Sequence, residues 1–472
     1  MIILCRFAII FLLIFSVKFR LKGQSVQGLK LSYTEFIAAV KSYHPLVVNY
    51  KIENQIAEAD LQRARGGFDP VLEGKMGSKT IDGVNYYNER NASLGIPVWY
   101  GVEIRGKYSY IDGDKLNNSE TPGELYQVGV TLPLLQNLLY DKRRAILDQA
   151  KEGLNMAKAE QIIRINEVLL EADNTYWNWV KEYELLKLQS EVVEVNRKRV
   201  SLTLKTLEYG ERAAIDTTEA ISQLQSFQLD EQDAYLRFLK ATQELTLFLW
   251  KENNQPYDIL DGLIPERPLS SIDVYKEYPV LIRNVREKST FDHGSLRYYL
   301  GKQNYLISEK ALKFQSLLPK VNFTYNYLNK QNRRSEVFPM FEDNFQYGLK
   351  LELPIFLRQA KGDYKIAKHK LYQNSLEIQY KAKEIENKVT NYINNLTNYH
   401  SQIRIAERNI ENYQKLLQAE ELRFANGESS LFVINSRENK LIDAQSKILD
   451  LRLKFMHSYN ELKWLNNSFI AE

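Results

Sequence analysis

A long hydrophobic seam near the end of the chain constrains the fold more than any other feature of the sequence. Apolar side chains recur there at alternating steps of three and four, and Glu420 alone interrupts the series. The seam residues are Val389, Tyr392, Leu396, Tyr399, Ile403, Ala406, Ile410, Tyr413, Leu417 and Phe424. A period near 3.5 over roughly five heptads predicts a long helix wound around neighbouring helices. We expect this helix to end at Asn426-Gly427, because glycine suits a left-handed C-terminal cap.

A matching seam lies earlier in the chain and ends at Gly210, with Ser190 and Arg197 as its two exceptions. Its members are Ile165, Leu169, Ala172, Tyr176, Trp179, Tyr183, Leu186, Val193, Val200, Leu204 and Leu207. Gly210 and Gly427 are 217 residues apart, and the same offset brings the two seams into phase. Two halves built on one plan are the simplest explanation.

Helical and strand-like segments precede the long helix in each half. In the first half, residues 32–66 predict helices with a break before Pro45, since the residue before a proline disfavours helix. Partial alternation predicts strands at 70–80, at 92–112 with an interruption at Pro97, and at 125–132.

The second half repeats this order, with a helix at 293–316 and strands at 320–329 and 345–353. Residues 320–329 alternate aromatic and polar side chains, as the wall of a barrel between lipid and lumen does.

Proline spacing shows where the halves differ. Pro70 and Pro133 are 63 residues apart, whereas Pro319 and Pro354 are 35 apart. The excess indicates an extra hairpin near residues 86–120 in the first half. This hairpin lies either outside the barrel wall or in an extracellular loop, and its Asp and Asn content favours the loop.

Each long helix is expected to be followed by a returning helix, so that helical hairpins cover residues 136–250 and 356–466. A helix of about 70 residues is about 105 Å long, which suits a rod or the wall of a tube rather than a compact domain.

The domain organisation follows from these patterns. Residues 1–23 are expected to be a signal peptide, because Arg6 precedes an apolar run that is shorter than the roughly 20 residues needed to span a bilayer. A cleaved signal is favoured over a retained anchor. Residues 24–260 and 261–472 then form the two repeats. The chain's one cysteine, Cys5, lies inside the predicted signal.

Composition argues against several classes of function. The chain has 63 Lys and Arg against 59 Asp and Glu, so no basic excess exists to bind nucleic acid. No two of the five histidines have the spacing of metal ligands on one helix face, and no phosphate loop or nucleophile elbow occurs. We therefore predict no catalytic residue, no cofactor and no metal site.

The arrangement as a whole resembles the TolC family of outer-membrane efflux channels. The resemblance rests on the turns at residues 209–216 and 426–433, on the strand-to-helix passages at 129–133 and 348–354, and on Gly67-Phe68-Asp69-Pro70 before the first strand. It covers nearly all of the predicted mature chain, and the order and duplication of these motifs make it more specific than any one motif.

The resemblance implies a mainly α fold with a β-barrel part. Three chains, each giving four strands, would form a twelve-stranded barrel in outer-membrane lipid, above an α-barrel of coiled-coil hairpins in the periplasm. Such a homotrimer would be a passive channel-tunnel of a tripartite efflux or type I secretion system. Its partners would be a periplasmic adaptor (membrane fusion) protein and an inner-membrane transporter.

The resemblance also implies roles for the hairpin turns. An aspartate six residues after the glycine faces the pore in the family, and Asp216 occupies that position. The alternative is a capping box, Asp216-Thr-Thr-Glu219, in which the aspartate has no further role. The second half has Val433 at the matching position and a capping-box pattern beginning at Asn435. The second half would therefore add no carboxylate to a ring of aspartates around the pore.

The tips of the two hairpins would contact the adaptor. The tip residues are Tyr209, Gly210, Glu211, Asn426, Gly427 and Glu428. Ordinary helix-turn chemistry explains the same residues equally well. A different class of function, a periplasmic coiled-coil adaptor or scaffold without a channel, also uses long hairpins, but it leaves the alternating aromatic strands unexplained.

Overall fold

The computed structural model describes residues 30–117, 119–210, 213–252, 255–257, 262–271, 274–287, 293–330 and 344–466. The predicted signal peptide and Glu211 lie outside this set. The chain divides into two compact units. The first consists of Met1–His44, Ala172–Asp273 and Gln402–Lys454, and the second of Pro45–Glu171, Val274–Ser401 and Phe455–Glu472. Each unit takes segments from both sequence halves, so the proposed two-repeat division remains a prediction.

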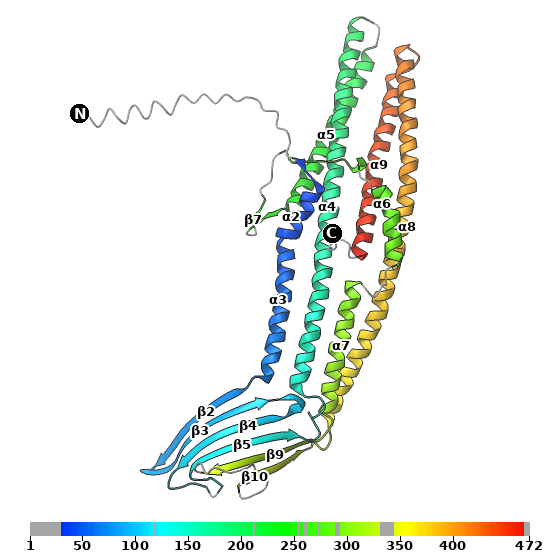
Figure 1. The fold of residues 1–472 in the computed structure, drawn as a ribbon. Helices are drawn as coiled ribbons and strands as arrows, with labels where there is room; N and C mark the ends of the chain where they lie inside the picture. The colour runs from blue at the N-terminus through cyan, green and yellow to red at the C-terminus, as the bar shows by residue number, and fades with distance from the viewer. Residues whose placement is uncertain are drawn as a thin grey trace, which may run out of the picture. The chain divides into compact units, whose positions relative to one another are not determined.

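The first unit contains two helical hairpins and a short covering helix, α2 (Tyr33–Tyr43). One hairpin joins the later part of α4 (Lys142–Glu208) to α5 (Ala214–Thr246). The other joins the end of α8 (Arg358–Ala425) to the start of α9 (Leu431–Leu465). Figure 1 shows the two hairpins side by side, with their turns at the same end.

The core of this unit is aromatic near α2 and aliphatic toward the turns. Tyr176 and Trp179 are fully buried, and the Trp179 indole N–H donates to Thr242 Oγ1 at 3.0 Å. Val193, Phe227 and Ile442 form a buried cluster that draws on both hairpins. The hairpins are therefore held together by side chains that the heptad pattern places inward.

The predicted seams are confirmed along α4 and α8. Every seam residue is buried or half-buried except Leu204. The positions between seam residues are largely exposed along the later part of α8, as their Lys, Glu and Asn content predicts.

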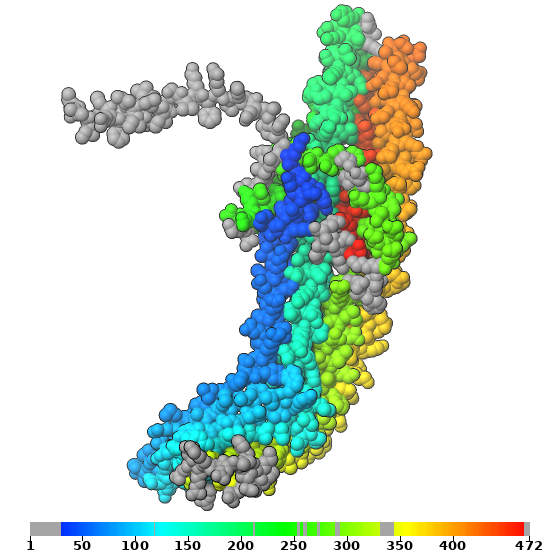
Figure 2. Space-filling view, in the orientation of Figure 1, coloured from blue at the N-terminus to red at the C-terminus, as the bar shows by residue number. Residues whose placement is uncertain are grey.

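The second unit contains α3 (Pro45–Arg65), α6 (Val274–Glu287), α7 (Gly294–Gln315), the remaining parts of α4, α8 and α9, and a sheet. Figure 2 shows α3 packed on the surface beside α4, where the Asn54 amide donates to Gln161 Oε1. Helix α6, which the sequence did not predict, places Tyr275 and Tyr278 against Phe455.

The sheet has six antiparallel strands in the order β10-β9-β5-β4-β3-β2. They are β2 (Val71–Ile81), β3 (Val84–Pro97), β4 (Glu103–Asp112), β5 (Gly123–Pro133), β9 (Lys320–Lys330) and β10 (Phe345–Glu352). Figure 1 shows them as one curved sheet.

One expectation about the strands was wrong. The extra hairpin forms β3 and β4 within a six-stranded sheet rather than an extracellular loop. The contribution of four strands from each chain to a barrel stays a prediction. The Asp82-Gly83 turn between β2 and β3 has φ angles of 51° and 77°, which are those of a tight type I′ hairpin. Of the Asp and Asn residues that favoured a loop, Asn88, Asn91 and Asp112 lie within β3 and β4, whereas Asp114 and Asn117 lie in the connection between β4 and β5.

The first long helix begins at Lys142, six residues later than expected. Asn137 has a φ angle of 73°, which is incompatible with a helix at that point. Asp141 then caps the helix, since its carboxylate accepts the Arg144 backbone N–H at 3.4 Å.

Among the helices that the structure describes, none combines the length and apolar character needed to cross a bilayer.

Candidate functional site

Both hairpin turns are built around a glycine in the left-handed conformation. The φ angles are 74° at Gly210 and 78° at Gly427. The Gly427 N–H donates to the Phe424 carbonyl at 3.0 Å, and the Glu428 N–H donates to the Arg423 carbonyl at 2.8 Å. This pair of bonds is a Schellman cap, so the predicted left-handed cap at Asn426-Gly427 is confirmed.

The turn residues are available to a partner. Tyr209 is 80% exposed, and Gly210, Asn426, Gly427 and Glu428 are also exposed. An exposed tyrosine at the tip of a rigid hairpin is a common kind of anchor in protein interfaces. Docking of an adaptor at these residues stays a prediction.

Asp216 lies in the first turn of α5 and is half-buried. The capping box predicted for this residue was wrong, because the helix begins at Ala214 and Ala213 occupies the cap position without a side-chain bond. An acidic group in the first turn still interacts favourably with the helix dipole. Glu219, the other half of the predicted box, instead accepts the Asn435 amide at 3.3 Å.

Val433 and Asn435 lie inside α9, which begins at Leu431. The second predicted capping box was therefore also wrong. Asn435 is only 6% exposed, and its amide joins α9 to α5 through Glu219. The structure thus brings Asn435 and Glu219 together, with Asp216 one helical turn before Glu219 on α5.

A buried ion pair near the turns was missed by sequence reasoning. The Arg199 guanidinium donates to both carboxylate oxygens of Glu438, at 2.5 and 3.2 Å, and to Asn196 Oδ1 at 2.7 Å. Glu438 is 5% exposed. This two-pronged contact holds α4 against α9. A charged residue beside the seam position Val200 was the only local signal, and it does not identify a partner 239 residues away.

Glu420, which interrupts the seam of α8, closes the second turn. Its carboxylate accepts the Ser429 hydroxyl at 2.5 Å and pairs with Arg423 at 3.4 Å. A buried carboxylate needs such partners to offset its lost hydration. The exception in the seam therefore has a structural reason.

The strand registers define a mainly apolar and a mainly polar face across all six strands. The mainly apolar face also carries Asn88, Arg90, Asp112, Glu124 and Asn329, and the mainly polar face also carries Val71, Tyr87, Ile111, Leu125 and Leu328. The apolar face carries Leu72, Met76, Ala92, Leu94, Ile96, Ile104, Tyr108, Tyr110, Tyr126, Val128, Val130, Leu132, Val321, Phe323, Tyr325, Tyr327, Phe345, Tyr347, Leu349 and Leu351. The polar face carries Glu73, Lys75, Lys79, Glu89, Asn91, Ser93, Glu103, Arg105, Lys107, Gln127, Thr131, Lys320, Asn322, Thr324, Asn326, Gln346, Lys350 and Glu352.

The apolar face is too large and too exposed for a surface in contact with water alone. Leu72 and Met76 are each 78% exposed, and Tyr347 and Leu349 are 63% and 64% exposed. An apolar surface of this extent marks a membrane or protein contact. A sheet with one lipid-like and one water-like face has the chemistry of a channel wall.

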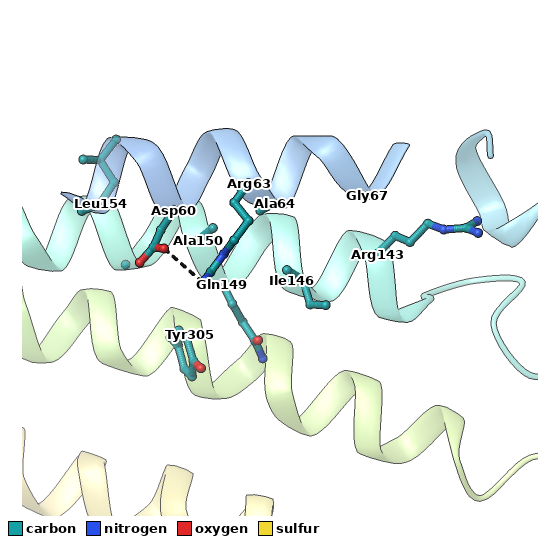
Figure 3. Close-up of a pocket in the computed structure, with 12 residues that line it drawn as sticks. Asp60, Arg63, Ala64, Gly67, Arg143, Ile146, Gln149, Ala150, Leu154 and Tyr305 are labelled. Atoms are coloured by element: carbon teal, nitrogen blue, oxygen red, sulfur yellow. Dashed lines mark ion pairs between the residues drawn. The ribbon is translucent and has the colours of Figure 1, made fainter. Parts of the chain in front are cut away.

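A cavity of about 670 Å³ lies in the second unit, between α3, α4 and α7. Figure 3 shows Asp60 and Arg63 pointing toward each other at this cavity, while Arg143 points away from them. The Arg63 guanidinium and the Asp60 carboxylate are 3.0 Å apart and exposed, as in an ordinary surface ion pair. In the part of the chain that the structure describes, no group of three or more His, Cys, Asp or Glu side chains could hold a metal ion.

Comparison with known proteins agrees with this geometry. Residues 311–467 match a family model described as outer membrane efflux protein. None of the curated proteins matches the chain.

Several solved structures share the fold. A crystal structure of CusC has a TM-score of 0.64 at 14% identity, covering 92% of this chain and 91% of that one. The Campylobacter jejuni CmeC outer membrane channel has a TM-score of 0.62 at 14% identity, with 92% and 84% covered. The open state of the Neisseria gonorrhoeae MtrE outer membrane channel has a TM-score of 0.63 at 12% identity, with 92% and 88% covered.

Proposed function

We propose that this chain forms a passive conduit for export across the outer membrane, because residues 311–467 match the model of the outer membrane efflux protein family and the fold is that of solved outer membrane channels. The resemblance to TolC-family channels inferred from the sequence is confirmed. We place the chain in the outer membrane with its helical hairpins extending into the periplasm, and we expect no catalytic activity.

One observation supports a conduit above all others: the sheet carries a mainly apolar face and a mainly polar face, with Arg90, Asp112 and Glu124 as charged exceptions on the apolar side. In a membrane, backbone N–H and C=O groups of strands are satisfied only in a closed barrel. A single sheet of six strands has two open edges, so closure requires further copies of the chain. We propose a homotrimer, in which the apolar faces meet lipid and the polar faces line the passage.

The helical hairpins would continue the passage into the periplasm. Exposed turn residues such as Tyr209 and Glu428 would meet a periplasmic adaptor, and an inner-membrane transporter would supply the energy. MtrE, one of the proteins of like fold, was described as an outer membrane channel in an open state. A gate at the hairpin tips of this chain, with Asp216 facing the pore, is proposed by analogy.

The experiment that tests the channel separates it from a periplasmic scaffold. The full chain is expressed in a Gram-negative host, membranes are fractionated, and the purified protein is added to a planar bilayer. A channel gives heat-resistant trimers in the outer-membrane fraction and discrete conductance steps. A soluble monomer without conductance would overturn the proposal.

A deletion provides the matched control. Removing residues 70–132 takes away β2 to β5 and leaves the helical hairpins. A scaffold should remain folded and soluble after this deletion, because its helical hairpins are intact. A channel should lose its membrane insertion, because the remaining two strands cannot close a barrel.

A further inference from the structure

We propose that the two junctions between the sheet and the long helices, residues 134–143 and 353–361, bind the headgroups of anionic phospholipids in the periplasmic leaflet of the outer membrane. We call these residues the junction surface. The inference rests on the proposed channel and deepens it, because it assigns a lipid partner to residues outside the sheet. It does not depend on how many strands each copy brings to the wall.

The apolar face of the sheet continues past the ends of β5 and β10. The Leu134 N–H donates to the Val321 carbonyl at 2.8 Å, which extends the register between β5 and β9 and places Leu134 on the apolar face. Residues 126–134 of this face are nine residues long, and a tilted strand needs roughly nine to eleven to cross a bilayer. Leu134 would therefore lie at the edge of the hydrocarbon. On the other junction, Ile355 follows β10 and is 87% exposed.

The side chains next to this edge are also apolar and exposed. Leu139 is 72% exposed and Phe356 is 69% exposed. The exposed Trp99 and Tyr100, in the turn between β3 and β4, lie beside the first junction, since the Arg144 guanidinium is 5.0 Å from the centre of the Tyr100 ring. Tyrosine and tryptophan are enriched at the boundary between membrane and water. The junction surface thus has the apolar half of an interfacial contact.

Four basic residues follow the apolar ones. Lys142 and Arg143 open α4, and Arg358 and Lys361 lie in the first turn of α8. Arg143 is half-buried and the other three are exposed. Neither helix has an acidic residue in its first turn, and positive charge at the start of a helix opposes the helix dipole. The stability of the helices therefore does not explain these bases.

The four bases also lack carboxylate partners within the chain. Asp141, their neighbour in the sequence, pairs with Arg144 at 2.6 Å. Figure 3 shows Arg143 pointing away from the ion pair at the cavity. The Arg358 guanidinium lies over the exposed ring of Phe356, 5.1 Å from its centre. Among the residues that the structure describes, no carboxylate forms an ion pair with any of the four.

An anionic phospholipid matches both parts of the junction surface. Its acyl chains would contact the apolar residues, and its phosphate would meet the bases, whose aliphatic stems reach along apolar surface toward the headgroups. Helix α3, which also ends at the sheet, has Arg63 and Arg65 in its last turn, so this end of the unit is basic on each of the three helices. A zwitterionic lipid carries a compensating ammonium group, so the excess of bases favours an anionic headgroup.

The lipid preference of the purified complex tests the inference. The full chain is solubilised in detergent and exchanged into mixed micelles that contain phosphatidylglycerol or phosphatidylcholine with the same acyl chains, and bound lipids are counted by native mass spectrometry. The test variant combines Lys142→Gln, Arg143→Gln, Arg358→Gln and Lys361→Gln. The matched control removes the same charge from exposed lysines of the first unit, with Lys198→Gln, Lys205→Gln, Lys415→Gln and Lys440→Gln.

We expect the natural chain and the control to retain phosphatidylglycerol in preference to phosphatidylcholine. Each base near an anionic surface strengthens the attraction by about fivefold, so the test variant should lower this preference by at least about tenfold. The preference should also weaken between about 0.1 M and about 1 M salt, where the Debye length falls from about 10 Å to about 3 Å. Should the test variant assemble poorly, Arg358→Gln alone, at an exposed position, should give a smaller loss.

Several outcomes would overturn this inference and leave the channel standing. Conducting trimers without a lipid preference would do so, and so would equal losses in the test variant and the control. A changed ion selectivity of the channel with an unchanged lipid preference would place the bases in the passage. Loss of trimers with the preference retained would make the junction surface a contact between copies. A soluble monomer that binds neither lipid would overturn the channel as well.

Discussion

Arg199 and Glu438 show at the scale of single residues how the hairpins are held in place. The guanidinium and the carboxylate are both largely buried and contact each other through two hydrogen bonds. A buried pair of this kind contributes little beyond what an apolar pair would, but removal of one partner leaves a charge without compensation.

We expect Glu438→Gln to destabilise the assembled protein by up to about 3 kcal/mol, because the buried Arg199 then keeps only the half-exposed Glu421, 3.7 Å away, as a counter-charge. The double variant Arg199→Met with Glu438→Gln should recover most of that loss, and Arg199→Met alone completes the cycle. Unfolding of the detergent-solubilised protein, followed by circular dichroism for the four members of the cycle, measures the difference. Equal losses in the single and double variants would show that the pair has no special role.

Glu184 provides a second residue-scale test. Burial raises the pKa of this carboxyl above its ordinary value of 4.5, although the Leu269 backbone N–H donates to it and works in the opposite direction. The folded state therefore binds a proton more readily than the unfolded state, and stability falls as the pH rises above about 4.5 through the folded-state pKa.

Glu184→Gln keeps an oxygen that can accept the Leu269 N–H and cannot ionise. Relative to the natural chain, this variant should gain stability as the pH is raised from 4 to 7 and should gain little at pH 4. Melting temperatures at a series of pH values measure the difference, with the exposed Glu191→Gln on the same helix as the control. A constant difference at every pH would contradict the assignment.

At the scale of elements, two kinds of hairpin organise the molecule. The helical hairpins turn at glycines with positive φ angles, and β2 and β3 turn at Asp82-Gly83. These turns set which residues of the following helix or strand face inward. An error of one residue in the strand turn would move the apolar side chains to the other face.

Gly427→Ala should destabilise the second hairpin by about 1–2 kcal/mol, because a Cβ is disfavoured in the left-handed conformation. Gly427→Asn should cost less, since asparagine tolerates that conformation. Proteolysis at the turn, compared between the two variants, measures local opening. Similar cleavage of both variants would indicate that the φ angle is not the limiting feature.

The wall position of β3 can be tested with a pair of neighbouring substitutions. Leu94→Arg places a charge on the apolar face and should cost about 2–4 kcal/mol if the residue lies near the middle of the bilayer. Ser93→Arg places the same charge on the polar face and should be tolerated. The yield of heat-resistant trimers in outer membranes is the measurement, and equal yields from the two variants would place β3 outside the lipid.

At the scale of the whole molecule, strand number and copy number are coupled. With six strands in each chain, two copies would supply twelve strands and three copies eighteen. Native mass spectrometry of the detergent-solubilised complex should give three chains per particle. A particle of two chains would contradict the proposed homotrimer.

Local periodicity determined much of this protein in advance. The 3.5-residue seams predicted α4 and α8, glycine predicted the cap at residue 427, and alternation predicted β5, β9 and β10, because these features depend on residues that are close in the chain. The exposed tip residues Tyr209, Asn426 and Glu428 were found for the same reason.

Only the tertiary structure decided the features that depend on distant residues. Arg199 meets Glu438 across 239 positions, Asn435 meets Glu219 rather than capping its own helix, and β3 and β4 join the sheet although their Asp and Asn content favoured a loop. Hydrogen bonds between strands and contacts between helices stabilise pairings of distant residues, and no local sequence pattern encodes those pairings. The number of strands in the sheet of each chain was therefore settled by pairing in three dimensions.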